Sequence, residues 1–168
     1  MRCDGHDALF EGATSAVDEG HAWFVDYAIA VGAGWVTRSA RVRSHSGLGT
    51  NEVWLEADGA GGWRVNGSHA PHLDGCLDVD LESSSLTNAF PIHRLALGIG
   101  QAADAPAAYV RALDLSVQRL QQRYVRLEDD RDGERYHYIS PEFEFECQLV
   151  YDGTGLVVEY PGIATRSA

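Results

Sequence analysis

The sequence predicts a mainly β protein, and two observations support this fold class. Apolar residues alternate with polar ones in several segments, which is the period of a half-buried strand. Turns rich in glycine, such as residues 58–62, separate these segments at hairpin spacing. Only residues 101–109 suggest a short helix, and no internal repeat is present. We therefore expect adjacent antiparallel strands with at most one or two short helices.

The N-terminal half has the pattern of a strand meander. Alternation is clearest in residues 21–31, where Trp23, Val25, Tyr27 and Ile29 share one parity. A small, polar segment at residues 12–20 is predicted to be a loop. The expected strands cover residues 6–13, 21–31, 35–44, 52–57 and 63–65.

The C-terminal half continues the pattern with strands at residues 133–140, 142–151 and 156–160. Residues 115–127 fit a helical stripe or a strand equally well. The segment 142–151 alternates most regularly and predicts one buried face. That face carries Phe143, Phe145, Cys147, Leu149 and Tyr151.

A central stretch, residues 77–97, organises the chain. Two apolar segments, 77–82 and 92–97, are predicted to be strands that hold a polar elbow, Ser83 to Asn88. Small polar side chains there favour local hydrogen bonds or contact with a ligand. Asp78, Asp80 and Glu82 alternate with apolar residues, so we expect a solvated strand face. The alternative is that these carboxylates act together in an enzyme.

Composition limits the classes of protein. A chain of 168 residues suffices for one domain that buries roughly 70% of its unfolded surface. No run of about 18 apolar residues exists, so we expect no membrane span. The N-terminus lacks a signal-peptide layout. Cys3, Cys76 and Cys147 are odd in number and suit free thiols, which favours a cytoplasmic location.

The net charge of −12 comes from 25 acidic and 13 basic residues, and every basic residue is arginine. Such a chain repels phosphate backbones and anionic lipid surfaces. We therefore expect no nucleic-acid partner and no stable membrane insertion.

Two motifs are weak candidates for a cofactor or a metal. Residues 98–103 match a G-x-G-x-x-A fingerprint, but Asp104 and Pro106 leave no room for the helix that it needs. Residues 69–76 contain two histidines and a cysteine, but Pro71 breaks any helix that would align the histidines. We expect neither a cofactor nor a metal ion.

Aromatic residues are the main candidates for a binding surface. Four tryptophans fall on predicted strands, and Trp54 lies on the parity opposite Val53 and Leu55. It therefore meets a second layer or lines a cavity. Core packing explains most of these residues, and the functional alternative is a curved sheet around an apolar cleft.

The central stretch also resembles a known family. Residues 80–95, with Thr87-Asn88, Pro91-Ile92 and Arg94, are similar to the signature of the putative glycolipid-binding family, a bacterial domain. Four positions depart from the family pattern, which favours Pro, Thr, Leu and Arg there; they are Ser85, Ala89, Phe90 and His93. Flanking matches include residues 63–65, 73–76, 115–117, 122–124, 136–138, 155–157 and 160–162.

The resemblance implies one domain over residues 1–168, built as a strongly bent antiparallel sheet. It is similar to the half-barrels, or spiral β-rolls, of lipoprotein carriers and encloses an apolar cleft. It also favours strand at residues 115–127. With His93 in place of an arginine, recognition of an anionic head group would depend on Arg94. The candidate ligand-binding residues are Trp54, Trp63, Asp80, Thr87, Asn88, Arg94, Tyr124 and Tyr160.

The preferred hypothesis is a non-catalytic binding protein for a lipid or glycolipid-like amphiphile, with a neutral or sugar head group. One alternative is an enzyme that acts on a similar ligand with Asp78 and Asp80. Another is a scaffold domain without a ligand. No serine elbow or other catalytic set is recognisable.

Overall fold

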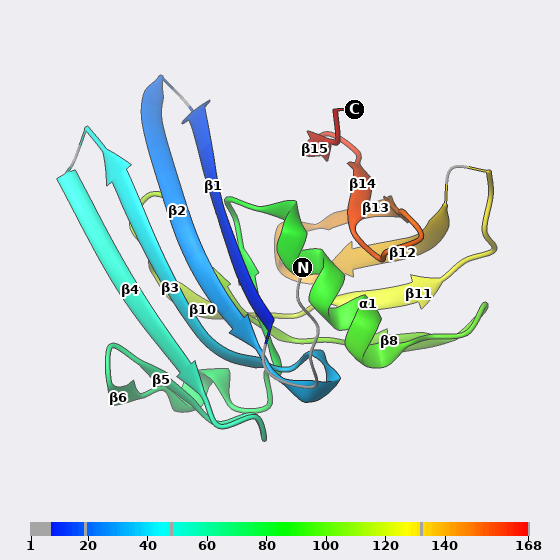
Figure 1. The fold of residues 1–168 in the computed structure, drawn as a ribbon, viewed down its shortest axis with the longest axis horizontal. Coiled ribbons are helices and arrows are strands. Elements are labelled where there is room, and N and C mark those ends of the chain that lie inside the picture. Colours follow the sequence, from blue (N-terminus) through cyan, green and yellow to red (C-terminus); the bar gives the residue numbers. More distant parts are fainter. Residues whose placement is uncertain (1–7, 19, 48, 132, 168) are drawn as a thin grey trace.

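A computed structural model describes residues 8–18, 20–47, 49–131 and 133–167. It confirms a mainly β fold with short helices, in which the strands are distributed over three hydrogen-bonded sheets (Figure 1). Two six-stranded sheets flank a three-stranded one. The start of the strand predicted at residues 6–13 and the free thiol predicted at Cys3 lie outside the described residues.

The first six-stranded sheet follows chain order and is antiparallel throughout. The bounds of β2 are those that alternation predicted, because one parity of this strand is buried from Val25 to Val31. Its strands are β1 (Ala8–Asp18), β2 (His21–Val31), β3 (Thr37–Ser46), β4 (Gly49–Ala57), β5 (Trp63–Val65) and β6 (Ser68–His69).

The loop predicted at residues 12–20 is wrong, because β1 continues to Asp18 in unbroken register with β2. Backbone hydrogen bonds with β2 outweigh the preference of the small, polar side chains of this segment for a loop. Gly12 lies opposite Tyr27, and a Cβ on Gly12 would come within 2.3 Å of the Tyr27 hydroxyl. The missing side chain lets Tyr27 cross β1 and reach Ser84, with 2.8 Å between the two hydroxyl oxygens.

The three-stranded sheet has the order β10-β9-β7, and β7 pairs with β9 in parallel. All four residues of β7 are buried, so the solvated face predicted for Asp78 and Asp80 is wrong; Glu82, after the strand, is exposed. Side chains from distant segments cover both faces of β7. The strands are β7 (Asp78–Leu81), β9 (Ala107–Val110) and β10 (Val117–Leu120).

The second six-stranded sheet has the order β15-β14-β13-β12-β11-β8 and is antiparallel. Phe143, predicted on its buried face, lies in a turn before β13 and is 46% exposed. The strands are β8 (Ala102–Asp104), β11 (Arg123–Arg126), β12 (Glu134–Ser140), β13 (Phe145–Tyr151), β14 (Val157–Tyr160) and β15 (Ala164–Thr165).

Two assignments of helix and strand are wrong. Of residues 92–97, predicted as a strand, residues 92–95 belong to helix α1 (Ala89–Leu95), because Pro91 lies in its first turn, where no backbone N–H is required. Residues 101–109, predicted as a helix, form β8 and β9. Short 3-10 turns complete the structure: η1 (Ala33–Trp35), η2 (Pro71–Leu73), η3 (Ser85–Asn88) and η4 (Pro141–Phe143).

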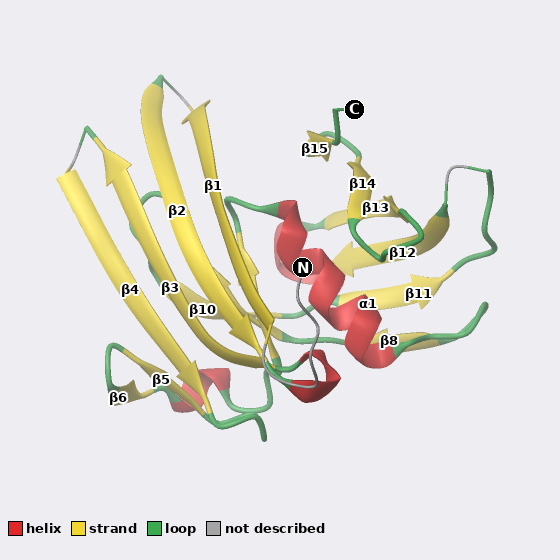
Figure 2. Ribbon diagram, viewed as in Figure 1, coloured by secondary structure: helices red, strands yellow, loops and turns green. Residues whose placement is uncertain are grey.

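Helix α1 lies between the two six-stranded sheets in Figure 2. The buried residues divide into two clusters on either side of it. One cluster packs behind β2–β5 and includes β7 and Phe90, and the other packs behind β11–β14 and includes Ile92. Two residues of one short helix, on opposite sides of a single turn, therefore pack in different cores. Within the described residues, no helix has the length and apolar character needed to cross a membrane.

Candidate functional site

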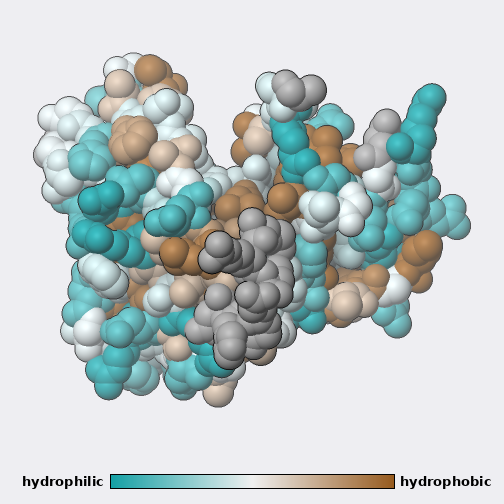
Figure 3. Space-filling view, viewed as in Figure 1, coloured by the Kyte–Doolittle hydropathy of each residue, from teal (hydrophilic) through white to brown (hydrophobic). Residues whose placement is uncertain are grey.

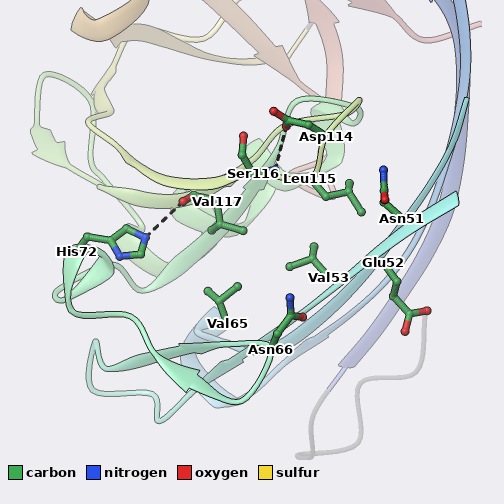
Figure 4. Close-up of a pocket in the computed structure, with 10 residues that line it drawn as sticks. All are labelled: Asn51, Glu52, Val53, Val65, Asn66, His72, Asp114, Leu115, Ser116 and Val117. Atoms are coloured by element: carbon green, nitrogen blue, oxygen red, sulfur yellow. Dashed lines mark hydrogen bonds between the residues drawn. The ribbon is translucent and has the colours of Figure 1, made fainter. Parts of the chain in front are cut away.

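Two cavities are candidates for a ligand site, and the smaller one, about 350 Å³, lies between β4, β5 and the loop before β10. Several of its polar groups already have partners within the protein, two of which are marked in Figure 4. Asp114 accepts a hydrogen bond from the Ser116 amide at 2.9 Å, and His72 Nε2 lies 3.3 Å from the Val117 carbonyl oxygen. Asn66 Oδ1 accepts from the Trp54 amide at 2.9 Å. None of the sequence-predicted site residues lines this cavity.

The larger cavity, about 690 Å³, lies between the free end of β1, the elbow after β7 and the second six-stranded sheet. In Figure 3 the surface is hollowed between the part formed by β1–β4 and the part that carries β14 and β15, and apolar side chains are visible within the hollow. The lining residues are Ala16, Asp80, Leu81, Glu82, Ser84, Ser85, Asn88, Tyr109, Leu120, Tyr138, Ser140, Phe143, Phe145, Tyr160, Gly162 and Ile163.

Asp80 forms the polar floor of this cavity and is only 8% exposed. Thr87 Oγ1 lies 2.6 Å from Asp80 Oδ1, and Gln122 Nε2 donates to Asp80 Oδ2 at 2.6 Å. Burial is the largest effect on the carboxyl and raises its pKa, while these two hydrogen bonds lower the pKa in part. Both partners are uncharged, so Asp80 is a buried carboxyl held by neutral groups.

Thr87 fixes the elbow by its hydroxyl group. Its oxygen accepts from the Leu81 amide at 3.2 Å and lies 2.9 Å from the Ser84 carbonyl oxygen. A hydroxyl has one proton, so Thr87 donates to Asp80 or to Ser84 but not to both at once. The protonation state of Asp80 and the hydrogen bonding of the elbow are therefore coupled.

Asn88 connects the elbow to the second core. Its amide nitrogen donates to the Tyr124 hydroxyl at 3.0 Å, and its backbone carbonyl accepts from the Tyr151 hydroxyl at 3.2 Å. Tyr124 and Tyr151 are fully buried. Asn88 lines the cavity, whereas Tyr124 lies behind it and positions Asn88.

Aromatic rings form the wall opposite the elbow. The rings of Tyr138, Phe145 and Tyr160 pack mutually, with centroids 5.9–6.4 Å apart. Burial raises the pKa of Tyr138 and Tyr160, so both hydroxyls stay protonated at neutral pH and are available as donors. At the mouth, Phe143 and Ile163 are 46% and 58% exposed. The wall thus combines apolar ring faces with hydroxyl groups.

Two predicted site residues lie in the first sheet and line neither cavity. Trp54 is 47% exposed on β4, where its indole donates to Glu52 at 2.7 Å. Trp63 is 1% exposed in the first core and donates to the Cys76 carbonyl at 2.8 Å. The sequence selected both for their aromatic character, but an aromatic side chain on a strand packs in a core or on a surface as readily as in a cleft.

Arg94 does not line the cavity either, because it is committed to Asp78. The guanidinium contacts both carboxylate oxygens of Asp78, with Nε 3.1 Å from Oδ1; the Asp78 side chain is buried and that of Arg94 is 13% exposed. His93, at the position where the family favours arginine, stacks on Trp35 with 3.8 Å between ring centroids. In this structure both residues pack within the protein.

The structure thus gathers Asp80, Thr87, Asn88, Tyr124 and Tyr160 at one site. Sequence reasoning missed Gln122, Tyr109, Tyr138 and Phe145 as members of this site. A signal existed for two of them, since the resemblance includes residues 122–124 and 136–138. Gln122 contacts Asp80 directly and Tyr138 contacts Gln122, and both contacts depend on strand pairing that periodicity does not reveal.

Comparison with known proteins is consistent with this fold. The model of the putative glycolipid-binding family matches residues 1–166. No curated protein matches the chain. The crystal structure of a DUF1089 family protein from Pseudomonas aeruginosa is similar, with a TM-score of 0.85 and 36% identity, over 99% of this chain and 89% of that one. The chain therefore belongs to the putative glycolipid-binding family.

Proposed function

We propose that the chain, as one domain over residues 1–168, binds a lipid or glycolipid-like amphiphile in the larger cavity without catalysing a reaction. The observation that carries the proposal is the lining of this cavity, which joins apolar and aromatic walls to a small set of polar groups. A volume of about 690 Å³ lies within the range of small-molecule sites. Membership of the family supports the same class of ligand.

The distribution of side chains suggests how an amphiphile would lie. An acyl chain would pack on Leu120, Phe143 and Phe145, and the head group would meet Asp80 and Asn88. Burial of about ten methylenes gains roughly 8 kcal/mol at about 0.8 kcal/mol each. Ordering and immobilisation reduce that gain, so we expect micromolar affinity.

The electrostatics of the site favour a head group without negative charge. Within the described residues that line the cavity, no lysine, arginine or histidine occurs, and Asp80 and Glu82 are both acidic. The net charge of −12 adds to this field. Arg94, the expected contact for an anion, is engaged by Asp78.

The two-carboxylate alternative receives no support from the geometry. Asp78 faces Arg94, whereas Asp80 faces Thr87, Gln122 and the cavity. The two side chains therefore have different surroundings and different partners.

Calorimetric titration with decyl glucoside below its micellar concentration tests the proposal. We expect one binding site per chain, and we expect Ala16→Trp to abolish binding by filling the cavity mouth. Ser15→Trp is the matched control, since neighbouring residues of a strand point to opposite faces and Ser15 is exposed.

Native mass spectrometry of protein purified from its own host, followed by lipid extraction, would identify the natural ligand. Absence of any co-purified lipid, together with no heat of binding for decyl glucoside or other amphiphiles, would reject the binding role. Equal effects of Ala16→Trp and Ser15→Trp would place the ligand elsewhere.

A further inference from the structure

The cavity contains a buried carboxyl group that has no counter-charge. Asp78 and Asp80 are two residues apart on β7, and both are buried. Asp78 is paired with Arg94, while the hydrogen-bond partners of Asp80 are the neutral side chains of Thr87 and Gln122. Within the part of the chain that the structure describes, no arginine or histidine forms an ion pair with Asp80.

The second carboxylate of the lining differs from Asp80 in this respect. Glu82 Oε1 lies 3.8 Å from the Arg111 guanidinium, and Glu82 Oε2 accepts from the Ala112 amide at 2.7 Å. Glu82 is also exposed to solvent. The uncompensated charge of the cavity is therefore concentrated on Asp80, where burial makes it most costly.

The aromatic wall suits a cation. Tyr138, Phe145 and Tyr160 line the cavity, as do Tyr109 and Phe143, which pack edge to face with centroids 5.5 Å apart. Ring faces attract organic ammonium groups, and the attraction strengthens where water is excluded. A carboxylate floor under aromatic walls combines the two groups that proteins use to hold such a cation.

We propose that the cavity selects an amphiphile whose head group carries a primary amine, such as an amino sugar or an alkylammonium, and that this ammonium is the counter-charge of Asp80. This inference deepens the proposed function and depends on it. The ammonium donates hydrogen bonds to the carboxylate oxygens, each of which has lone pairs left beside its bond to Thr87 or Gln122. The apolar tail lies against the same walls as in the general proposal.

A matched set of probes tests this selection by calorimetry: decylammonium, decyl glucoside and decyl phosphate share one chain and differ in head group. We expect decylammonium to bind at least about tenfold more tightly than decyl glucoside, and decyl phosphate to bind most weakly. Asp80→Asn should weaken the binding of decylammonium by at least about 30-fold, which is the lower end of the loss for removing one partner of a buried charge pair. The affinity of Asp80→Asn for decyl glucoside should differ from that of the wild type by less than about threefold.

Asp80→Asn is expected to fold, because rotating the Gln122 amide lets its oxygen accept from the new amide and from Tyr138. Glu56→Gln removes one negative charge at an exposed position of β4 and controls for net charge. It should leave the decylammonium affinity unchanged.

Three outcomes would overturn the inference. Decyl glucoside binding as tightly as decylammonium would leave the proposed function standing but reject amine selection. Equal losses in Asp80→Asn and Glu56→Gln would show adsorption to an acidic surface. If no amphiphile binds, the proposed function fails as well. Should Asp80→Asn not fold, the ratio of the wild-type affinities for decylammonium and decyl glucoside still tests amine selection.

Discussion

The two cores of this protein differ in what their buried side chains require. The first core, behind β2–β5, is mostly aliphatic, with one tyrosine among nineteen buried members in the described residues. In the second core, behind β11–β14, five of the eight buried members described are tyrosines. Aliphatic side chains need only close packing, whereas a buried hydroxyl also needs a hydrogen-bond partner. The tyrosine-rich core therefore contributes polar groups at its boundary, and the larger cavity opens there.

Strand β7 lies between the two cores, and its two aspartates show the same contrast. Asp78 is closed off by an ion pair with Arg94, and Asp80 is open to the cavity. The ion pair of Asp78 contributes to the stability of the fold, whereas the carboxyl of Asp80, which lines the cavity, is available to a ligand. The predictions below test this division, beginning with the largest expected effect.

Removal of Arg94 should be the most damaging change. Arg94→Ala leaves Asp78 buried without its partner, and we expect the free energy of unfolding to fall by about 3–5 kcal/mol. Urea denaturation measures the loss. Arg123→Ala, which breaks the exposed pair with Asp104, is the control and should cost no more than about 1 kcal/mol. A loss below about 1 kcal/mol for Arg94→Ala would mean that Asp78 is protonated or hydrated.

The aliphatic core should respond to loss of volume. Leu55 is fully buried, and Leu55→Ala should lower the free energy of unfolding by about 2–5 kcal/mol, because a cavity replaces packed methyl groups. Glu56→Ala, on the opposite face of β4, should change it by less than about 0.5 kcal/mol. Amphiphile binding should be unaffected in both variants. A change in affinity in Leu55→Ala would contradict the division between the two cores.

The tyrosine-rich core should respond to loss of a single hydroxyl. Tyr124→Phe keeps the ring but leaves the buried Asn88 amide without its acceptor, so we expect a loss of about 1–3 kcal/mol. A double-mutant cycle with Asn88→Ala isolates this contact by chemical denaturation. The two changes should be coupled by about 0.5–3 kcal/mol. Strict additivity would show that Asn88 is not held by Tyr124.

The smallest effect concerns pH. The folded protein raises the pKa of Asp80 above its ordinary value of 3.8, so the folded state holds a proton that the unfolded state releases. The stability due to Asp80 is therefore full below pH 3.8 and is lost as the pH rises through the folded pKa. Relative to Asp80→Asn, the wild type should lose stability as the pH rises from below 3.8 towards neutrality. Thermal melts across this range measure the difference, and a constant difference would show that Asp80 ionises normally.

Alternation along the sequence by itself determined the fold class and the bounds of β2. A strand with one buried face must repeat every two residues, so its signal is local. The motif around Thr87 and Asn88 likewise indicated the family and located the elbow of the cavity. The negative net charge followed from composition alone, and it is the reason that we expect no anionic ligand.

Only the tertiary structure decided the surroundings of Asp78 and Asp80. The sequence pattern of β7 is that of a half-exposed strand. In the structure Asp78 pairs with Arg94, 16 residues along the chain, and Asp80 accepts a hydrogen bond from Gln122, 42 residues along the chain. The same holds for β1, whose polar half is a strand because β2 pairs with it. Burial of a charged group is a property of the whole packed chain, since its cost depends on which distant partners reach it. Periodicity reports one segment at a time and contains no information about those partners.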